Sequence, residues 1–374
     1  MKVVQCLYSG LSGVADVAFN LISGDRDRIH DHSLLFIGVV PLVDSYRDWC
    51  ERSDVRFRTV RSVPKQPWRT WPDIYRALQE LKPDALIVHG GGPTMVPALA
   101  YARKTRCALL MVEHHPIGLR GAADWAFSRL GLLAGAQTVV LSDDYAAQFK
   151  ARLKRWIRPG QMLVIPNGVD ADLYRPSIAI RRAGADLLRI GMAARFSAAK
   201  RFDLVVEAAR LIGARSEQRR WQFTLAGSGD TFDAVKQAAH ALPAGIEISF
   251  PGMLPKEQLP DWYRDLDIYV HAAEEETLSM ALLQAMSSGL PIAASDVAGI
   301  NNLIGGDPPA GMLVPEQTAP AFAEALIRLA DAPEVAEVLG RQARERVLGR
   351  YSQDAMFGAY DAVIRAAAQA RKPA

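Results

Sequence analysis

Short apolar runs alternate with amphipathic segments along the whole chain. The apolar runs predict strands at 3–7, 34–39, 85–89, 108–112, 138–141 and 162–165 in the first half, and at 190–192, 223–226, 246–250, 268–271 and 291–294 in the second. Between them, apolar residues recur at helical spacing, for example at 201–212, 231–241, 280–288 and 320–329. This order predicts parallel sheets with helices on both faces, which is a doubly wound α/β architecture formed twice.

The length of 374 residues favours two domains, because single hydrophobic cores stop growing near ~250–300 residues. We expect the break after Ile-Pro-Asn-Gly-Val-Asp at 165–170, in the polar stretch 175–186. The first domain would cover 1–174 and the second 175–354, with a C-terminal helix at about 355–374 packing back on the first. Ligands of such sheets bind beyond the carboxyl ends of the strands, so two facing Rossmann-like domains would place the active site in the cleft between them.

Composition is that of a soluble globular protein, 49% hydrophobic and 23% charged. No apolar run reaches the ~18 residues expected of a membrane span, and the N-terminal residues read as a strand rather than a signal peptide. The three cysteines, Cys6, Cys50 and Cys107, are widely spaced and show no metal-type pairing. These features favour the reducing cytoplasm as the compartment.

The stretch 276–291 has the layout of a loop that turns into a short helix and ends on a glycine. Ser279 is a plausible N-cap, and Gly289 with the proline that soon follows predicts the end of the helix. The unpaired backbone N–H groups at such a helix start can bind a phosphate. Glu276 before the helix and Gln284 inside it could then bond hydroxyls on either side. The stretch therefore predicts a site for a sugar, a diphosphate and a ribose.

This stretch resembles the acidic signature of the retaining family-4 glycosyltransferases, in which a Glu, seven residues and a second Glu precede Ala-Met. Glu276 matches the first Glu, which contacts the donor sugar in that family; the second, which binds the ribose hydroxyls, is Gln284 here. Gln still accepts and donates hydrogen bonds, so the resemblance implies weakened rather than lost ribose binding. The hexapeptide at 165–170 also looks like the segment that closes the N-terminal domain in this family. The resemblance covers nearly the whole chain and implies the GT-B fold.

Two cations follow the strand at 190–192, on a loop that leads into a helix. Departure of a nucleoside diphosphate builds negative charge, and fixed cations stabilise it without a metal. The spacing of Arg195 and Lys200 is similar to that of the family's Arg and Lys that bind the donor phosphates, and the resemblance gives them those roles. Solvated surface cations are the other interpretation of this pattern.

Loops after other strands carry glycines, as expected where the backbone approaches a ligand closely. Family enzymes have glycines beside the donor diphosphate after the first strand, a glycine loop next to the nucleotide, and a later loop whose backbone reads the base. A tight turn without a ligand stays an alternative for these loops. By this resemblance we expect the donor to contact Gly10, Gly13, Gly227, Gly252, Met253, Leu278, Ser279, Met280 and Gln284.

Two histidines end strands of the first half. His114, in Glu-His-His-Pro, matches the family's strand-end histidine, which would hydrogen-bond the donor sugar or help to hold the acceptor. His89, ahead of three glycines, is a candidate for the acceptor side. A purely structural role stays open for both.

The resemblance implies a retaining glycosyltransferase, a hexosyltransferase that moves a sugar from a nucleotide-diphosphate donor to a hydroxyl of a glycan or lipid-linked acceptor in surface polysaccharide or glycolipid synthesis. A UDP-sugar is the favoured donor and GDP-mannose the alternative. No Asp or Glu is placed as a nucleophile, so we expect a same-face displacement with Arg195, Lys200, Glu276 and His114 as the catalytic residues. No aspartate pair of the metal-binding kind stands beside these motifs, so we expect no metal or other cofactor.

Two other functions are compatible with the same sequence. A GT-B protein can be a sugar-nucleotide epimerase, which acts on the donor without an acceptor. A non-catalytic nucleotide- or glycan-binding partner of another transferase is the second alternative. Gln284 motivates it, as does the segment 298–302, which has Asn302 where family members often have the Glu of Gly-Gly-Ile-Pro-Glu.

Positive charge is concentrated in one part of the chain. Residues 52–158 hold 18 Lys or Arg and 8 Asp or Glu, whereas the whole chain has a net charge of only +3. Segments 56–71 and 150–158 mix these cations with tryptophan, a combination that suits an anionic membrane surface. We therefore expect peripheral binding at the inner membrane face and an acceptor presented there, such as a polyprenyl-diphosphate-linked glycan; a solvated basic face is the alternative. Nucleic acid is not expected, because no nucleic-acid motif accompanies the charge.

Overall fold

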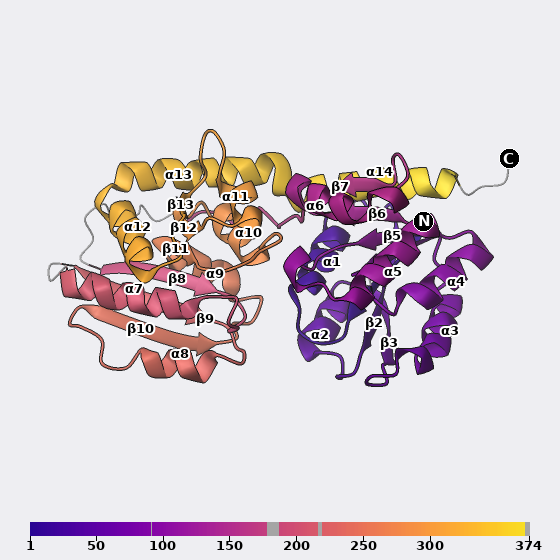
Figure 1. The fold of residues 1–374 in the computed structure, drawn as a ribbon, viewed down its shortest axis with the longest axis horizontal. Coiled ribbons are helices and arrows are strands. Elements are labelled where there is room, and N and C mark those ends of the chain that lie inside the picture. The colour runs from indigo at the N-terminus through magenta and orange to yellow at the C-terminus, as the bar shows by residue number, and fades with distance from the viewer. Residues whose placement is uncertain (91, 178–186, 216–218, 371–374) are drawn as a thin grey trace. The chain divides into compact units, whose positions relative to one another are not determined.

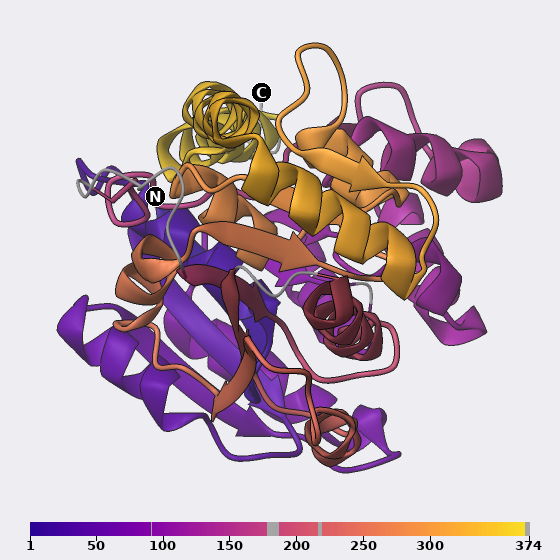
Figure 2. The ribbon, with the colours of Figure 1, turned by 90° about the vertical axis from the view of Figure 1, so that its left-hand side faces the viewer.

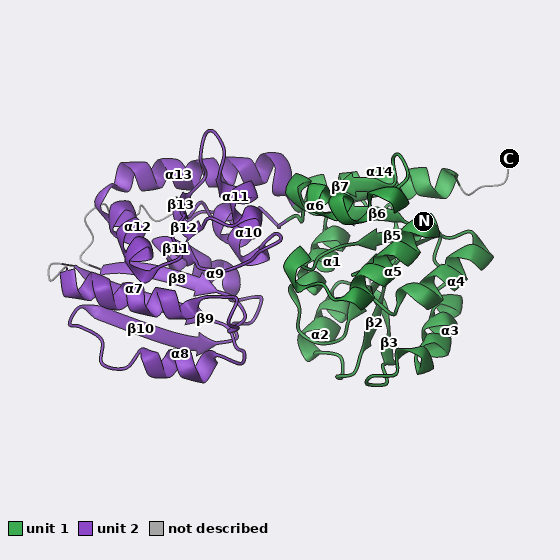
Figure 3. Cartoon of the chain, in the orientation of Figure 1, with its two compact units in different colours: residues 1–168, 353–374 green, residues 169–352 purple. Residues whose placement is uncertain are grey.

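The computed structural model of the protein describes residues 1–90, 92–177, 187–215 and 219–370. The chain divides into two compact units (Figure 3). The first unit comprises 1–168 and 353–374, and the second unit comprises 169–352. Of the stretch 175–186, in which the break was expected, residues 178–186 lie outside the described part of the chain.

The first unit is built on seven parallel strands in the order β3-β2-β1-β4-β5-β6-β7. The strands are β1 (Lys2–Tyr8), β2 (Asp31–Gly38), β3 (Arg56–Arg61), β4 (Ala85–His89), β5 (Ala108–Val112), β6 (Gln137–Val140) and β7 (Met162–Val164). The α-helices are α1 (Gly13–Ser23), α2 (Asp44–Arg52), α3 (Trp71–Leu81), α4 (Met95–Thr105), α5 (Ala122–Leu133), α6 (Asp143–Leu153) and α14 (Gln353–Gln369). Because helices connect the parallel strands, the central strands are apolar on both faces.

Helices cover both faces of this sheet (Figure 1). α1 and α2 bury one face, where Phe19 and Tyr46 pack in one cluster with Phe36 of β2. α3 and α4 bury the other face in a second cluster with β1, β4 and β5. α14 joins this unit from the far end of the chain and packs beside α1, where Arg26 lies 3.0 Å from Asp354.

The second unit is built on six parallel strands in the order β10-β9-β8-β11-β12-β13. The strands are β8 (Leu187–Ala193), β9 (Arg220–Ala226), β10 (Ile246–Gly252), β11 (Ile268–His271), β12 (Ile292–Ser295) and β13 (Met312–Val314). The α-helices are α7 (Phe202–Arg215), α8 (Phe232–Ala238), α9 (Leu259–Asp265), α10 (Met280–Ser287), α11 (Ala298–Ile304), α12 (Ala319–Asp331) and α13 (Pro333–Arg346).

The core of the second unit lies between this sheet and the helices α7 and α12, which pack side by side on one face (Figures 1 and 2). Right-handed connections place α9 and α10 on the opposite face. In the core, the rings of Phe196 and Phe202 stack with centroids 3.8 Å apart. Phe196 belongs to the loop after β8, so this stack fixes the loop against α7.

The predicted doubly wound architecture is confirmed in both units, and all eleven predicted strands correspond to observed strands. The apolar pattern did not predict β3 and β13. β3 reads Arg-Phe-Arg-Thr-Val-Arg and is an edge strand, so its cations face solvent and no apolar run forms. β13 has only three residues, too few for an alternating pattern.

Each sheet has one point at which the strand order reverses. In the first sheet β1 lies between β2 and β4, and in the second β8 lies between β9 and β11. The chain leaves the two strands at such a point toward opposite faces, so a crevice opens beyond their carboxyl ends. The ends of β1 and β4, and those of β8 and β11, are therefore the positions at which side chains can meet a ligand.

Candidate active site

Three side chains meet at the carboxyl ends of β8 and β11. Lys200 lies on the loop after β8, His271 is the last residue of β11, and Glu276 lies on the loop that follows. The Lys200 ammonium pairs with Oε2 of Glu276, and Nε2 of His271 lies 3.3 Å from the same oxygen. The backbone N–H of Glu274 donates to the carbonyl oxygen of Ala199 over 2.9 Å and so ties the two loops together.

The Glu276 carboxylate is held in its charged form. Burial alone raises its pKa, but the hydrogen bond from His271 and the positive charge of Lys200 outweigh burial and lower the pKa from 4.5 to about 2. Its contribution to stability is therefore fully present above the unfolded pKa near 4.5 and is lost as the pH falls toward 2. Burial also lowers the pKa of His271, so at neutral pH this ring is uncharged and donates its Nε2–H to Glu276.

This arrangement leaves groups available for a ligand. An ammonium group has three donors, and the pairing with Glu276 uses one of them. Both described contacts to the carboxylate use Oε2, so Oε1 remains an acceptor for a hydroxyl. The cluster therefore combines a cation that can donate to an anion with a fixed carboxylate oxygen that can hold a hydroxyl.

Helix α10 begins next to this cluster and confirms the predicted N-cap. Ser279 is extended, and its Oγ accepts from the N–H of Leu282 over 3.3 Å. In the described part of the chain, the N–H groups of Met280 and Ala281 bond to no backbone carbonyl, so they remain donors at the positive end of the helix. Gly289 follows the helix with a φ of +65°.

Gln284, which replaces the family's second Glu, is buried inside α10. Its side-chain oxygen accepts from the hydroxyl of Tyr263 over 3.2 Å. The same hydroxyl lies 3.0 Å from the carbonyl oxygen of Ala281, so its single hydrogen is shared between these two acceptors. The predicted ribose contact of Gln284 stays a prediction.

The loop after β8 packs against the glycine loop after β9. Gly227 has a φ of +136°, and a Cβ there would overlap the carbonyl oxygen of Ala194. Gly229 has a φ of +153°, and a Cβ there would overlap the carbonyl oxygen of Phe196. These glycines are thus required by the close approach of two backbones. Arg195 lies between the two contacts, with its side chain exposed.

The glycine loop also bonds to the end of β10. The N–H of Gly227 donates to the carbonyl oxygen of Gly252 over 2.8 Å. Gly252 has a φ of +74° with open space around it, and the side chain of Met253 is 52% exposed. The loops after β8, β9 and β10 therefore form one layer at the carboxyl edge of the sheet.

Helix α11 approaches the loop of Glu276 through a glycine. A Cβ at Gly299 would overlap the carbonyl oxygen of Glu276, so only glycine allows this packing. Asn302 lies in the same helix, and its carbonyl oxygen accepts from the hydroxyl of Tyr351 over 3.3 Å. The backbone of this segment therefore packs directly against the loop of Glu276.

At the carboxyl edge of the first sheet, His89 ends β4 and His114 follows β5. Nδ1 of His89 lies 2.9 Å from Nε2 of His114, and Nε2 of His89 lies 2.8 Å from Oε1 of Gln5. Burial lowers the pKa of His89 to about 3, and burial together with neighbouring His89 and His115 lowers the pKa of His114 well below its usual value. Both rings are neutral at physiological pH.

The predicted glycines of the first unit differ in their surroundings. Gly10 follows β1, and a Cβ there would lie 2.5 Å from the ring of Tyr8. Gly13 starts α1 with no atom within 4 Å of a Cβ, so space for a ligand exists at that helix start. Contacts of both glycines with a diphosphate stay predictions.

A buried ion pair holds the loop that carries His114. Glu113 and Arg120 approach to 2.5 Å, and each side chain is 1% exposed. Arg120 also donates to the hydroxyl of Tyr145 over 3.0 Å, and that hydroxyl donates to the carbonyl oxygen of His115 over 2.8 Å. The ring of Trp125 lies 4.3 Å from the guanidinium carbon of Arg120. The loop is therefore held on both sides of His114, at Glu113 by the ion pair and at His115 by the hydroxyl of Tyr145.

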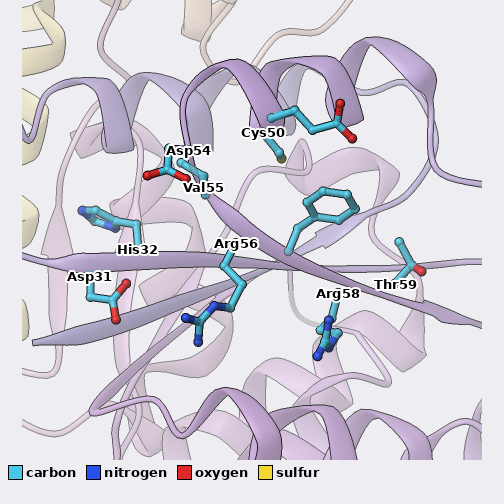
Figure 4. Close-up of a pocket in the computed structure, with 10 residues that line it drawn as sticks. Asp31, His32, Cys50, Asp54, Val55, Arg56, Arg58 and Thr59 are labelled. Atoms are coloured by element: carbon cyan, nitrogen blue, oxygen red, sulfur yellow. The ribbon is translucent and has the colours of Figure 1, made fainter.

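Two cavities of the first unit differ in position and chemistry. One of about 700 Å³ lies at the amino ends of β2 and β3, where the carboxylates of Asp31, Glu51 and Asp54 line it together with two arginines (Figure 4). Its mixed charge and its position at the wrong edge of the sheet do not suit a nucleotide donor. The other, of about 360 Å³, lies at the carboxyl edge and is mainly apolar, with Tyr8 and Trp71 among its lining residues.

His271 and Gln5 contribute to these two clusters but were not predicted from the sequence as functional residues. His271 ends a strand at the point of reversal, directly before the acidic loop, and that position could have indicated its role. Gln5 is a polar residue inside the apolar run of β1 and is fully buried, so it had to find hydrogen-bond partners. Among the described residues, no group of three or more His, Cys, Asp or Glu side chains is placed to hold a metal ion.

Two doubly wound parallel sheets, each with chemistry-bearing side chains at its point of reversal, define a glycosyltransferase fold of the GT-B type. The family model of Glycosyltransferase Family 4 matches residues 11–173, and that of Glycosyl transferases group 1 matches residues 179–346. The chain belongs to the family-4 glycosyltransferases, as its sequence motifs predicted.

Known relatives agree with this assignment. The chain is 29% identical over 244 residues to D-inositol 3-phosphate glycosyltransferase of Saccharomonospora viridis, covering 61% of this chain and 56% of the relative. It is 28% identical over 251 residues to GDP-mannose-dependent alpha-mannosyltransferase of Mycobacterium tuberculosis, covering 62% and 60%. The crystal structure of Anabaena HepE in complex with UDP and glucose shares the fold with a TM-score of 0.77 at 16% identity, covering 98% of this chain and 99% of that one. The matched region spans about half the length of the first curated relatives.

Proposed function

We propose that this protein is a retaining glycosyltransferase that moves a sugar from a nucleotide-diphosphate donor to a hydroxyl of a glycan or lipid-linked acceptor. The cluster of Lys200, His271 and Glu276 at the point of reversal of the second sheet carries the proposal. It supplies a cation for a departing diphosphate and a fixed carboxylate for a sugar hydroxyl at one position. An ordinary surface salt bridge would lack two features of this cluster, the buried neutral His271 and the adjoining start of α10.

Each group has a distinct role in the proposed transfer. The two remaining N–H donors of Lys200, the exposed guanidinium of Arg195 and the free amides at the start of α10 neutralise charge as the diphosphate leaves. Oε1 of Glu276 holds a hydroxyl of the donor sugar. With a pKa near 2, Glu276 is a weak base whose other oxygen is already bonded, which suits positioning rather than nucleophilic attack. The departing phosphate would then take the proton of the acceptor hydroxyl on the same face of the sugar.

The donor is proposed to carry uridine diphosphate. The structural neighbour from Anabaena was solved with UDP and glucose, which supports this choice. GDP-mannose is the other donor to test, because the mycobacterial relative is named for it. The loop of Gly252 and Met253 is the proposed contact to the base, since its backbone stands open at the carboxyl edge.

Nucleoside diphosphates are expected to raise the melting temperature of the purified protein. A ligand present at a hundred times its Kd adds about 2.7 kcal/mol of stability, so UDP should give a clear shift and the wrong base a smaller one. The measurement is a thermal melt with UDP, GDP, CDP and ADP in parallel. Lys200→Ala should reduce the shift, whereas Arg201→Ala, next to it on the same loop, should not. Absence of a shift with all four at millimolar concentration would contradict the donor site.

The acceptor is proposed to be presented at the cytoplasmic face of a membrane. Among the described residues, no helix combines the length and apolar character needed to cross a bilayer. Trp68 is 54% exposed within the basic segment 56–71, whereas Trp156 lies under Arg129 and Arg155, with ring distances of 5.6 and 5.1 Å. Trp68 is therefore the tryptophan best placed to enter a lipid interface, close to the apolar pocket at the carboxyl edge of the first sheet.

Vesicles that contain phosphatidylglycerol are expected to sediment the protein at low salt and to release it as salt screens the charges. Vesicles of pure phosphatidylcholine should not bind it. Trp68→Ser should weaken binding, and Val335→Ser, which changes an apolar residue of the second unit that is 46% exposed, should leave binding unchanged. Failure to sediment with anionic vesicles at low salt would rule out the membrane-facing acceptor.

A further inference from the structure

Gln5, His89 and His114 form a chain of hydrogen bonds across the carboxyl edge of the first sheet. Gln5 lies in β1, His89 ends β4, and His114 follows β5, so the chain crosses the point of strand reversal. Gln5 is 0% exposed, and both histidines are partly buried. The two imidazole rings are nearly parallel, 5.1 Å apart. Each of these hydrogen bonds determines which atom of the next side chain carries the hydrogen.

The first constraint is the orientation of the Gln5 amide. Its Nε2 lies 3.4 Å from the carbonyl oxygen of Ala18 in α1. That oxygen can only accept, so the NH2 group must face it and Oε1 must face His89. Oε1 also only accepts. Nε2 of His89, 2.8 Å away, must therefore carry the hydrogen.

The second constraint passes from His89 to His114. A neutral imidazole carries one hydrogen, so Nδ1 of His89 has a lone pair and accepts. Its partner at 2.9 Å is Nε2 of His114, which must then be the protonated nitrogen of that ring. Nδ1 of His114 is left with a lone pair and has no hydrogen bond to any described residue.

We infer that Gln5 and His89 are positioning residues that fix His114 as the Nε2–H tautomer, so that its Nδ1 is a hydrogen-bond acceptor for a ligand hydroxyl. An Nδ1 lone pair attracts an O–H or N–H donor and repels the oxygens of a phosphate. This position in the first unit would therefore select a sugar or acceptor hydroxyl, whereas the cations of the second unit select the diphosphate. Only the identity of that hydroxyl rests on the proposed function.

Burial supports this assignment. The low pKa of both rings keeps the chain neutral across the physiological range, and a protonated His89 would have no lone pair for His114. The backbone carbonyl that starts the chain belongs to a helix and cannot rotate. The tautomer of His114 is thus determined by the carbonyl oxygen of Ala18, which is linked to it through three successive hydrogen bonds.

The test uses imidazole nitrogen NMR of the full chain, with Gln5→Met as the variant that keeps the side-chain volume and removes the acceptor. In the unaltered protein both His89 and His114 should show the Nε2–H pattern from pH 6 to 8. In Gln5→Met, both rings should shift toward mixed tautomers. Gln161→Met is the matched control, because Gln161 is equally buried and donates to the carbonyl oxygens of Leu132 and Ala136 at the other edge of the sheet. An Nδ1–H pattern for His114, or an unchanged pattern in Gln5→Met, would overturn the inference.

Transfer kinetics separate this inference from the proposed function. A mixed tautomer of His114 weakens one hydrogen bond, the one from the ligand hydroxyl to Nδ1. We therefore expect kcat/KM to be about tenfold lower in Gln5→Met than in Gln161→Met. Equal kinetics in the two variants, with the tautomer changed as expected, would remove the positioning role and leave the transferase proposal standing. A protein that shows the Nε2–H pattern but transfers no sugar would support the tautomer assignment and contradict the proposed function.

Discussion

Replacing Lys200 by alanine is expected to lower the turnover of sugar transfer by about a hundredfold or more. A fixed donor aimed at developing charge contributes roughly 10²–10³ in kcat when it is the group removed. Lys200 is held toward the reacting position by Glu276, so its charge needs no rearrangement when the diphosphate departs. The measurement is kcat with a UDP-sugar and a hydroxyl acceptor, supported by circular dichroism to show that the variant is folded.

Arg201 provides the matched control for this experiment. It is the next residue on the same loop and also a cation, but it binds Asp203 at 2.8 Å and Glu274 at 3.2 Å on the surface. Arg201→Ala should change turnover by less than about threefold, since surface ion pairs contribute roughly 0–1 kcal/mol. Incubation of each variant with the donor alone distinguishes transfer from epimerisation, which would yield an isomer without an acceptor. Retention of turnover in a folded Lys200→Ala protein would refute the role of Lys200.

Replacing Arg120 by methionine is expected to destabilise the first unit by about 3–5 kcal/mol. The change leaves the Glu113 carboxylate buried without its cation, and breaking a buried pair costs about this much. It also removes the bond to Tyr145 that supports the loop of His114. The measurement is native-state hydrogen exchange of the β5 and β6 amides, which reports the opening of this unit separately from the second.

Two further variants test the physical reason for that loss. Arg76→Met breaks an exposed pair with Asp73, whose atoms lie 3.0 Å apart, and should cost less than about 1 kcal/mol of stability. The double variant Glu113→Gln with Arg120→Met removes both charges and should recover much of the stability, because no buried charge remains. If Arg120→Met lowers the stability of the first unit no more than Arg76→Met does, the buried pair does not anchor this loop.

Much of the fold could be predicted because burial on both faces makes parallel strands read as apolar runs. That rule found β1 and β11 and failed at β3, where an edge position allows three arginines. Turn and cap residues predicted local features equally well, since Ser279 needs only its own helix to act as an N-cap. Each of these predictions depends on a few neighbouring residues.

The candidate site could be predicted only in part, because its groups are brought together by packing. Lys200 and Glu276 were each predicted from local patterns, yet 76 residues separate them and their pairing depends on how two loops meet. The resemblance gave Gly227 a place beside the nucleotide, whereas the structure shows that its first requirement is the backbone of Ala194. The tautomer of His114 depends on Gln5 and Ala18, which no local pattern connects to it.

The way α14 joins the first unit has a consequence for biosynthesis. Gly24, at the end of α1, leaves room for the carbonyl oxygen of Gln353, where a Cβ would lie only 2.6 Å away, and His30 bonds Asp361 over 2.7 Å. Ribosomes deliver these partners only after every strand of the second unit has emerged. The packing of α14 against α1 can therefore form only after the second unit has been translated, so the first unit is completed last although its synthesis begins first.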